Sequence, residues 1–280
     1  MSLMQTIIFS SAVMLGLGIV FGIGLGYFAK IFKVQENPLI DEISDVLPGA
    51  NCGACGFSGC RALAESIISG KASIDKCRAG GEETIKNIAK ILGISEDNLS
   101  YERYIAIPLC KGSKSLAMKN AKVIGVKSCK LANNLKLSEK VCTYSCLGYG
   151  DCVLICPFNA IKMNDEGLPE IDSSLCTGCG LCVEECPREV IRLFPLREEV
   201  LAFCRNPEKG SAVRNACKIG CITCYICEKK CPKNAIKMVN NLPVIDIEKC
   251  DLCGICINVC PTKTLSLIKA LSTKEYDKKL

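Results

Sequence analysis

Histidine and tryptophan are both absent from the 280 residues of the sequence, and aromatic residues make up only 5% of it. Without histidine the chain cannot build a Ser-His-Asp or Cys-His nucleophile pair, a His-ligated catalytic zinc, a Rieske centre or a His-ligated haem. The shortage of aromatic side chains argues against base-stacking platforms, so we expect no nucleic-acid partner. A net charge of +6 is too small to indicate a partner by itself.

Charged side chains are missing from the amino end, where Lys30 is the first. The stretch from Ile7 to Phe28 is apolar and long enough to cross a bilayer as a helix, which takes about 20 residues. A cleaved signal peptide is the first alternative, but no basic residue precedes the run and the run is too long. A buried soluble helix is the second, but such a density of glycine is more usual in membrane helices. We therefore predict a single-pass anchor.

Two lysines, Lys30 and Lys33, follow this span directly. By the positive-inside rule they place the rest of the chain on the cytoplasmic side of the cell (inner) membrane. That compartment is reducing, which argues against a disulfide scaffold.

Cysteine is what the chain has in excess, with 24 residues, most of them in tight clusters. Cysteines two residues apart direct their sulfurs to one point, which suits a metal group better than disulfides to distant partners. In "NCGACGFSGC" and the segment after it, two, four and sixteen residues separate Cys52, Cys55, Cys60 and Cys77. Glycines between them let the backbone wrap closely around a group. Four thiolates suit zinc or a [4Fe-4S] cluster, and the glycine-wrapped spacing favours the cluster.

Helical spacing surrounds this first cysteine set. "RALAESIISG" indicates a short helix that ends near Gly70, and the apolar positions of residues 82–92 indicate another that stops at Gly93. We expect the second helix to cover the cluster.

The carboxyl half aligns with itself as two copies of one unit, beginning with "CPFNAIKM" at Cys156 and "CPKNAIKM" at Cys231. The sequence of each half predicts a ligand loop, followed by a short helix and then a strand. The spacing C-x2-C-x2-C-x3-C-P is a strong signal for [4Fe-4S] ligation, and the fourth cysteine ligates the other cluster of a pair. It occurs three times, at Cys176, Cys179, Cys182 and Cys186, at Cys221, Cys224, Cys227 and Cys231, and at Cys250, Cys253, Cys256 and Cys260.

The fourth half is irregular. "CTYSCLGYGDCVLICP" spaces its cysteines by three, five and three residues. By symmetry with the regular halves, we predict that Cys142, Cys146 and Cys152 share a cluster with Cys186, while Cys156 completes the partner cluster. A lost site with free thiols is the alternative. Two glycines in "LGYG" would let the longer loop bulge without displacing its ends.

Four cysteines, Cys110, Cys129, Cys204 and Cys217, fall outside these motifs. They could ligate a sixth cluster, pair as disulfides or be buried thiols, which is common for free cysteine.

Residues 111–140 contain eight lysines and one glutamate, which indicates either a docking face for an acidic carrier or anionic lipid, or a solvated face.

Taken together, the charge-free helix, "NCGACGFSGC" with Cys77, the stretched "CTYSCLGYGDCVLICPFNAI" and the repeats resemble the B subunit of the Rnf complex. That resemblance covers nearly the whole chain. It implies a subunit of a membrane-bound translocase, a ferredoxin:NAD oxidoreductase that moves Na+ or H+. The subunit would take electrons from soluble reduced ferredoxin and pass them to membrane and peripheral partner subunits. Some family members have one ferredoxin module and this sequence has two, so the resemblance does not say which module binds ferredoxin.

We therefore predict an α+β protein with one transmembrane helix, a small helical iron–sulfur domain and two tandem two-cluster ferredoxin-like modules. Five [4Fe-4S] clusters are expected, or six with the remaining cysteines. A polyferredoxin subunit of another membrane reductase and a structural zinc or disulfide protein are the alternatives. The expected divisions are residues 1–30 (anchor), 31–103 (iron–sulfur domain), 104–195 (basic segment and first module), 196–270 (second module) and 271–280 (tail).

Overall fold

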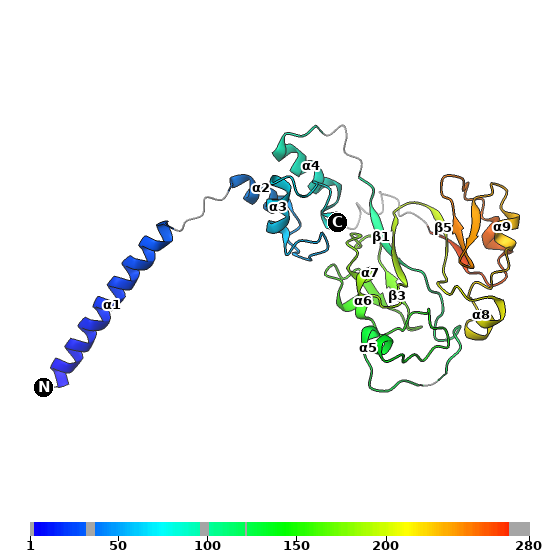
Figure 1. The fold of residues 1–280 in the computed structure, drawn as a ribbon, viewed down its shortest axis with the longest axis horizontal. Coiled ribbons are helices and arrows are strands. Elements are labelled where there is room, and N and C mark those ends of the chain that lie inside the picture. The colour runs from blue at the N-terminus through cyan, green and yellow to red at the C-terminus, as the bar shows by residue number, and fades with distance from the viewer. Residues whose placement is uncertain (1–2, 32–36, 96–100, 121, 269–280) are drawn as a thin grey trace.

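The structure is a computed structural model that describes residues 3–31, 37–95, 101–120 and 122–268. Helices and antiparallel strand pairs both occur in these ranges, which confirms the mixed α and β class. Figure 1 shows a long amino-terminal helix, a small helical part and a larger part that contains the strands. Lys33 and the tail at 271–280 lie outside the described residues. The division into domains stays a prediction.

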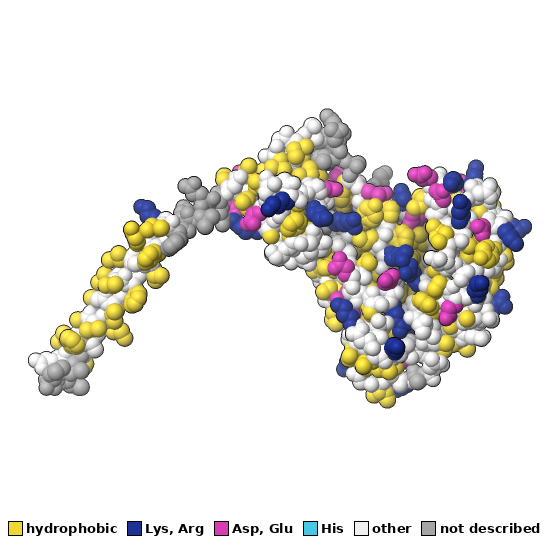
Figure 2. Space-filling model, in the orientation of Figure 1, with side chains coloured by type: hydrophobic (Ala, Val, Ile, Leu, Met, Phe, Trp, Pro, Cys, Tyr) yellow, Lys and Arg dark blue, Asp and Glu magenta, His cyan; other side chains and the backbone are white. Residues whose placement is uncertain are grey.

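Helix α1 (Leu3–Ile31) is the one described helix that is long and apolar enough to cross a membrane, over Ile7–Ile31. None of its most apolar window is buried against the rest of the described chain. Hydrophobic side chains cover the face seen in Figure 2. Such an exposed apolar helix needs another environment to bury it, and its length matches the hydrocarbon core of a bilayer.

The helical part consists of α2 (Pro38–Val46), α3 (Cys60–Ile68), the 3₁₀ turn η1 (Arg78–Gly80) and α4 (Gly81–Leu92). Helices α3 and α4 confirm the two helices expected from apolar spacing. The side chain of Asn37 caps α2 by accepting a hydrogen bond from Leu39 N. Ile43, Leu63 and Ile88 form a fully buried core against which the loop carrying Cys77 packs.

The first strand unit contains an outer pair and an inner hairpin. Strand β1 (Tyr104–Pro108) pairs antiparallel with β4 (Ile191–Pro195), and β2 (Ile161–Met163) pairs with β3 (Pro169–Ile171). Helices α5 (Cys129–Asn134), α6 (Asp151–Leu154) and α7 (Leu181–Glu185) lie in the connections. Strand β2 confirms the expected "AIKM" strand.

The second strand unit repeats this pattern. Strand β5 (Glu199–Ala202) pairs with β8 (Leu265–Ile268), and β6 (Ile236–Val239) pairs with β7 (Leu242–Ile245). Helices α8 (Gly210–Ala216), α9 (Ile226–Lys230) and α10 (Ile255–Val259) connect them. The side chains of Leu201 and Ile268 pack against the apolar core of the first unit, so the two units share a packed contact.

The ligand loop before α7 lies directly against β1. Gly178 has φ +67°, and a Cβ on it would lie 2.3 Å from the carbonyl oxygen of Tyr104. The corresponding positions of the second unit hold Thr223 and Leu252, also at positive φ. The close backbone contact, rather than the left-handed conformation alone, therefore requires glycine at position 178.

We predict that Gly178→Ala separates this loop from β1. Gly254→Ala is the matched control, because Gly254 has φ +73° and open space around its Cβ position. Amide hydrogen exchange followed by mass spectrometry should show faster exchange in residues 104–108 for the first variant, by roughly tenfold or more, equivalent to about 1.4 kcal/mol. Equal exchange of residues 104–108 in both variants would mean that the left-handed conformation alone, and not the contact with Tyr104, requires glycine at position 178.

Candidate iron–sulfur sites

All 24 cysteines are free thiols. In the described part of the chain, no three Cys, Asp or Glu side chains converge at the spacing of a single metal ion. Most of the thiols instead surround small cavities in sets of four, and the elements around them determine which four.

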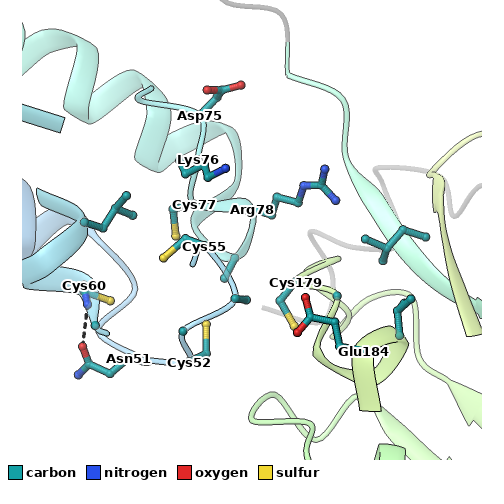
Figure 3. A pocket seen from close by; sticks show the side chains of 18 of the residues that line it. Asn51, Cys52, Cys55, Cys60, Asp75, Lys76, Cys77, Arg78, Cys179 and Glu184 are labelled. Atoms are coloured by element: carbon teal, nitrogen blue, oxygen red, sulfur yellow. Dashed lines mark hydrogen bonds between the residues drawn. The ribbon is translucent and has the colours of Figure 1, made fainter. Parts of the chain in front are cut away.

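The first set lines a cavity of about 470 Å³ in the helical part. Cys52 and Cys55 come from the glycine-rich loop, Cys60 begins α3, and Cys77 precedes η1. Figure 3 shows the four thiols around this space, with Asn51 Oδ1 accepting a hydrogen bond from Cys60 N at 2.8 Å. Burial, followed by the neighbouring thiols, raises the pKa of Cys77 above its ordinary value.

This cavity is shared with the first strand unit, because Cys179 and Glu184 also line it. Figure 3 shows Cys179 on the strand-unit side of this space. Burial raises the pKa of Cys179, and the Cys52 thiol raises it more than Cys176 of its own loop does. The guanidinium of Arg78 lies 5.2 Å from the ring centre of Tyr104 in β1, which joins the two parts beside the cavity.

Three further sets correspond to the regular motifs with their fourth cysteines exchanged. One cavity is lined by Cys156, Cys176, Cys179 and Cys182. Another is lined by Cys221, Cys224, Cys227 and Cys260. For the third set, burial raises the pKa of Cys256, and the neighbouring thiols that add to this effect are Cys250, Cys253 and Cys231. Exchange of the fourth cysteine between halves is therefore present in the geometry of both strand units.

Backbone N–H groups point at several of these sulfurs. Val190 N lies 3.4 Å from Cys186 Sγ, and Ala235 N lies 3.3 Å from Cys231 Sγ, so the turns after these two Cys-Pro pairs each supply a donor. Ala106 N, in β1, lies 3.4 Å from Cys176 Sγ. Donors of this kind stabilise negative charge on a thiolate and on a cluster bound to it.

The irregular half differs from the symmetry argument. Its cavity is lined by Cys129, Cys146, Cys152 and Cys186, and Cys142 is not among its residues. Burial raises the pKa of Cys146 to about 12, with Cys110 and Cys129 as the nearby thiols, and that of Cys152 to about 11, with Cys129 and Cys186. The structure thus places Cys129 where the spacing predicted Cys142.

The position of Cys129 depends on the carboxylate of Asp151, which is buried. Asp151 accepts hydrogen bonds from Cys129 N at 2.8 Å, Lys130 N at 3.0 Å and Ser128 Oγ at 2.9 Å. Burial alone would raise the pKa of Asp151, but these donors outweigh it and lower the pKa. Asp151 begins α6 and the three donors begin α5, so one carboxylate fixes both helix starts beside Cys152.

Sequence spacing could not reveal Cys129, because it is 22 positions away from its anchor Asp151. The available signal was local: Ser128 is a favourable helix N-cap, and its side chain accepts from Leu131 N. That signal predicts the start of a helix but not the thiols that face it.

The basic segment 111–140 is partly engaged within the chain. Lys114 Nζ donates to Asp165 O at 2.9 Å, Lys130 pairs with Glu185 at 2.7 Å, and Lys111 donates to Ser266. Lys140 is buried, with 6% of its surface exposed. Half of the eight lysines therefore have partners or burial inside the protein, which weakens the docking-face interpretation.

Three family models match parts of the chain: "Putative Fe-S cluster" over residues 47–79, "4Fe-4S binding domain" over residues 169–192 and "4Fe-4S dicluster domain" over residues 220–265. A relative from Methanosarcina acetivorans, named as the B subunit of an ion-translocating oxidoreductase complex, is 41% identical over 94% of this chain and 99% of its own length. The chain belongs to this family of B subunits. None of the three matched ranges covers the irregular half.

Two other relatives carry fuller names. The one from Acetobacterium woodii is the B subunit of a Na+-translocating ferredoxin:NAD+ oxidoreductase complex, and it is 39% identical over 84% of this chain and 70% of its own. The one from Clostridium ljungdahlii is the B subunit of a proton-translocating ferredoxin:NAD+ oxidoreductase complex, 41% identical over 89% and 88%. The resemblance inferred from the motifs is therefore confirmed.

The residues present fit iron–sulfur clusters. The sets contain thiols alone, nearly all of them are buried or half-buried, and N–H groups face the sulfurs. Four thiolates and surrounding N–H donors are the usual protein environment of a [4Fe-4S] cluster.

We predict that Asp151→Ala releases the start of α5. Losing a helix cap costs about 0.5–2 kcal/mol, so amide exchange at Cys129 and Lys130 should accelerate by roughly two- to thirtyfold. Asp165→Ala is the matched control, because that carboxylate is exposed in the β2–β3 turn. Unchanged exchange at residues 129–131 in Asp151→Ala would show that another contact holds this helix.

Proposed function

We propose that this chain carries electrons from reduced ferredoxin to membrane partner subunits, and so to NAD, in a complex that moves Na+ or H+. The names of the two relatives that specify ferredoxin and NAD+ support the reaction. Because one relative is named for Na+ and the other for protons at nearly equal identity, they do not select the ion.

The observation that carries the proposal is the succession of thiol sets. The sets of each strand unit exchange a cysteine, so neighbouring sites share one loop. Cys179, which belongs to a set of the first strand unit, also lines the cavity of the Cys52 set, and this contact joins the helical part to that unit. Sites in such contact suit electron transfer, whereas a structural metal site needs no neighbour.

A [4Fe-4S] cluster supplies one-electron oxidation and reduction at low potential. The chain's own residues would hold each cluster by four thiolates, exclude water through burial and stabilise the added charge through N–H donors such as Val190 and Ala235. Twenty of the proposed ligands follow from the motifs: Cys52, Cys55, Cys60 and Cys77, Cys142, Cys146, Cys152 and Cys156, and the twelve cysteines of the three regular motifs. Cys129 joins them beside Cys146 and Cys152, because the structure places it in the cavity from which Cys142 is absent.

We infer a direction from the arrangement. Electrons enter at the ferredoxin-like modules and leave by the set around Cys52, which is the thiol set nearest to the anchor in the chain. Residues 7–28 contain no charged side chain that could form an ion site within the membrane. Ion movement therefore belongs to partner subunits, as does the binding of NAD.

Cys55→Ala tests the exit. The variant should lose the set in the helical part, so the remaining clusters still reduce but electrons no longer reach the partner subunits in the assembled complex. Dithionite reduction followed by EPR measures the first, and ferredoxin-dependent NADH formation the second. Cys253→Ala is the comparison, because it removes a thiol in the far unit. NADH formation at the wild-type rate without the Cys55 cluster would refute this route.

Deletion of residues 2–31 tests the anchor. The shortened chain should move from the membrane pellet to the soluble fraction and keep its iron, because the most apolar window of α1 is not buried against the rest of the described chain.

Protease digestion tests the sidedness. In inside-out vesicles, protease should digest the full-length chain from the cluster-bearing side. Protection in inside-out vesicles together with digestion in right-side-out vesicles would reverse the proposed sidedness.

A further inference from the structure

Cys129 occupies the place beside Cys146 that the motif predicted for Cys142. Cys142 lies instead near three cysteines that belong to no motif. Burial raises the pKa of Cys142 to about 11, and the thiols that add to this effect are those of Cys110, Cys204 and Cys217. These residues come from four separate segments: the residues after β1, the start of the irregular motif, the residues after β5, and the end of α8.

Backbone pairing brings two of these segments together. Residues 116–118 run between the segment before Cys142 and the segment around Cys217. On one side Met118 O accepts from Val141 N at 2.8 Å, and on the other Met118 N donates to Ala216 O at 3.0 Å. Ala117 forms an antiparallel bridge with Cys217 itself. Residues 116–118 therefore bring Cys142 and Cys217 close together.

Cys110 and Cys204 complete the group. A Cβ placed on Gly112 would lie 3.4 Å from Cys217 Sγ and 3.5 Å from Cys110 Sγ, so both sulfurs border this glycine. The side chain of Asn206, which is 1% exposed, directs Nδ2 to Cys142 Sγ at 3.6 Å. Cys204 lies two residues before Asn206. The Cys110 thiol is among the neighbours that raise the pKa of Cys204.

A buried cation accompanies these thiols. Lys140 donates from Nζ to Gly112 O at 2.7 Å, and no ion pair among the described residues includes it. Burial raises the pKa of Cys217, and the ammonium of Lys140 partly opposes that increase. A buried ammonium needs compensating negative charge. A four-thiolate cluster would supply it, whereas two disulfides would leave the ammonium uncompensated.

We propose that Cys110, Cys142, Cys204 and Cys217 form a sixth four-thiolate site for a [4Fe-4S] cluster, and that Cys129 replaces Cys142 as the partner of Cys146, Cys152 and Cys186. The site lies between the two strand units, because two of its thiols belong to each. It rests on the cluster-based electron transfer proposed above. It gives every one of the 24 cysteines a ligand position.

The position of the site explains why the two units can act as one path. Cys142 precedes the thiols of the irregular half by four residues, and Cys217 precedes Cys221 of the second unit by four. Cys204 has Cys221 of the second unit and Cys110 of the proposed site as neighbouring thiols, and burial, followed by these thiols, raises its pKa to about 11. A cluster there would connect the units electronically.

The iron content of the full-length chain, purified without oxygen, is the first test and needs no variant to fold. Six clusters require about 24 iron and 24 acid-labile sulfide per chain, whereas five require about 20. About 20 iron, with Cys110 and Cys217 recovered as alkylatable thiols or as a disulfide by mass spectrometry, would overturn the sixth site. Zinc in place of iron would overturn the proposed function as well, so the two failures are distinguishable.

Paired variants test which cysteines share a site. Cys110→Ala and Cys142→Ala should each change one cluster, and the double variant should lose no more iron than the greater single loss. Cys110→Ala with Cys129→Ala should lose the sum of both single losses, because these residues belong to different sites. Ser211→Ala, on the exposed face of α8, is the control and should keep all of the iron.

The opposite pattern would refute the assignment. If Cys142 ligates with Cys146, then the Cys110 and Cys142 losses add, while Cys129→Ala keeps the wild-type iron and EPR spectrum. Lys140→Met gives an independent readout, because removal of a buried positive charge should shift one cluster signal to a lower potential in an EPR-monitored titration. Unchanged potentials for every signal would contradict a cluster beside Lys140.

Discussion

Four sulfur atoms have to converge on one compact group, and most of the chain after α1 is organised by this requirement. Helices α6, α7, α9 and α10 contain four or five residues, and the strands contain three to five. Isolated helices and hairpins of such lengths are not stable in water. With clusters bound, the free energy of ligation becomes folding free energy and supports elements that their own length cannot.

The same requirement couples neighbouring sites. A cysteine that follows one helix completes the set of the opposite half, so neither half can be moved without disturbing both. The contact between the helical part and the first unit extends this coupling through Cys52, Cys179 and the Arg78–Tyr104 contact. Close approach of successive sites is what electron transfer needs, and the packing that stabilises the chain supplies it.

Sequence patterns predicted the parts of the fold that depend on neighbouring residues. Helix α4 followed from apolar spacing and Gly93, and β2 followed from the repeated "AIKM". Patterns did not predict the pairing of β1 with β4 or of β5 with β8, since the paired residues are 63 to 91 positions apart. They also missed α5 as the carrier of a thiol in the irregular half.

By itself, the sequence determined the chemistry: many thiols, no histidine, three regular ligand motifs and one apolar span, which together indicate the family. Only the tertiary structure decided which thiols meet in the irregular half and around Gly112. The physical reason is that spacing constrains sulfurs only within one loop. Cys129 and Cys217 are positioned instead by distant contacts, namely the Asp151 carboxylate for the first and the backbone of residues 116–118 for the second.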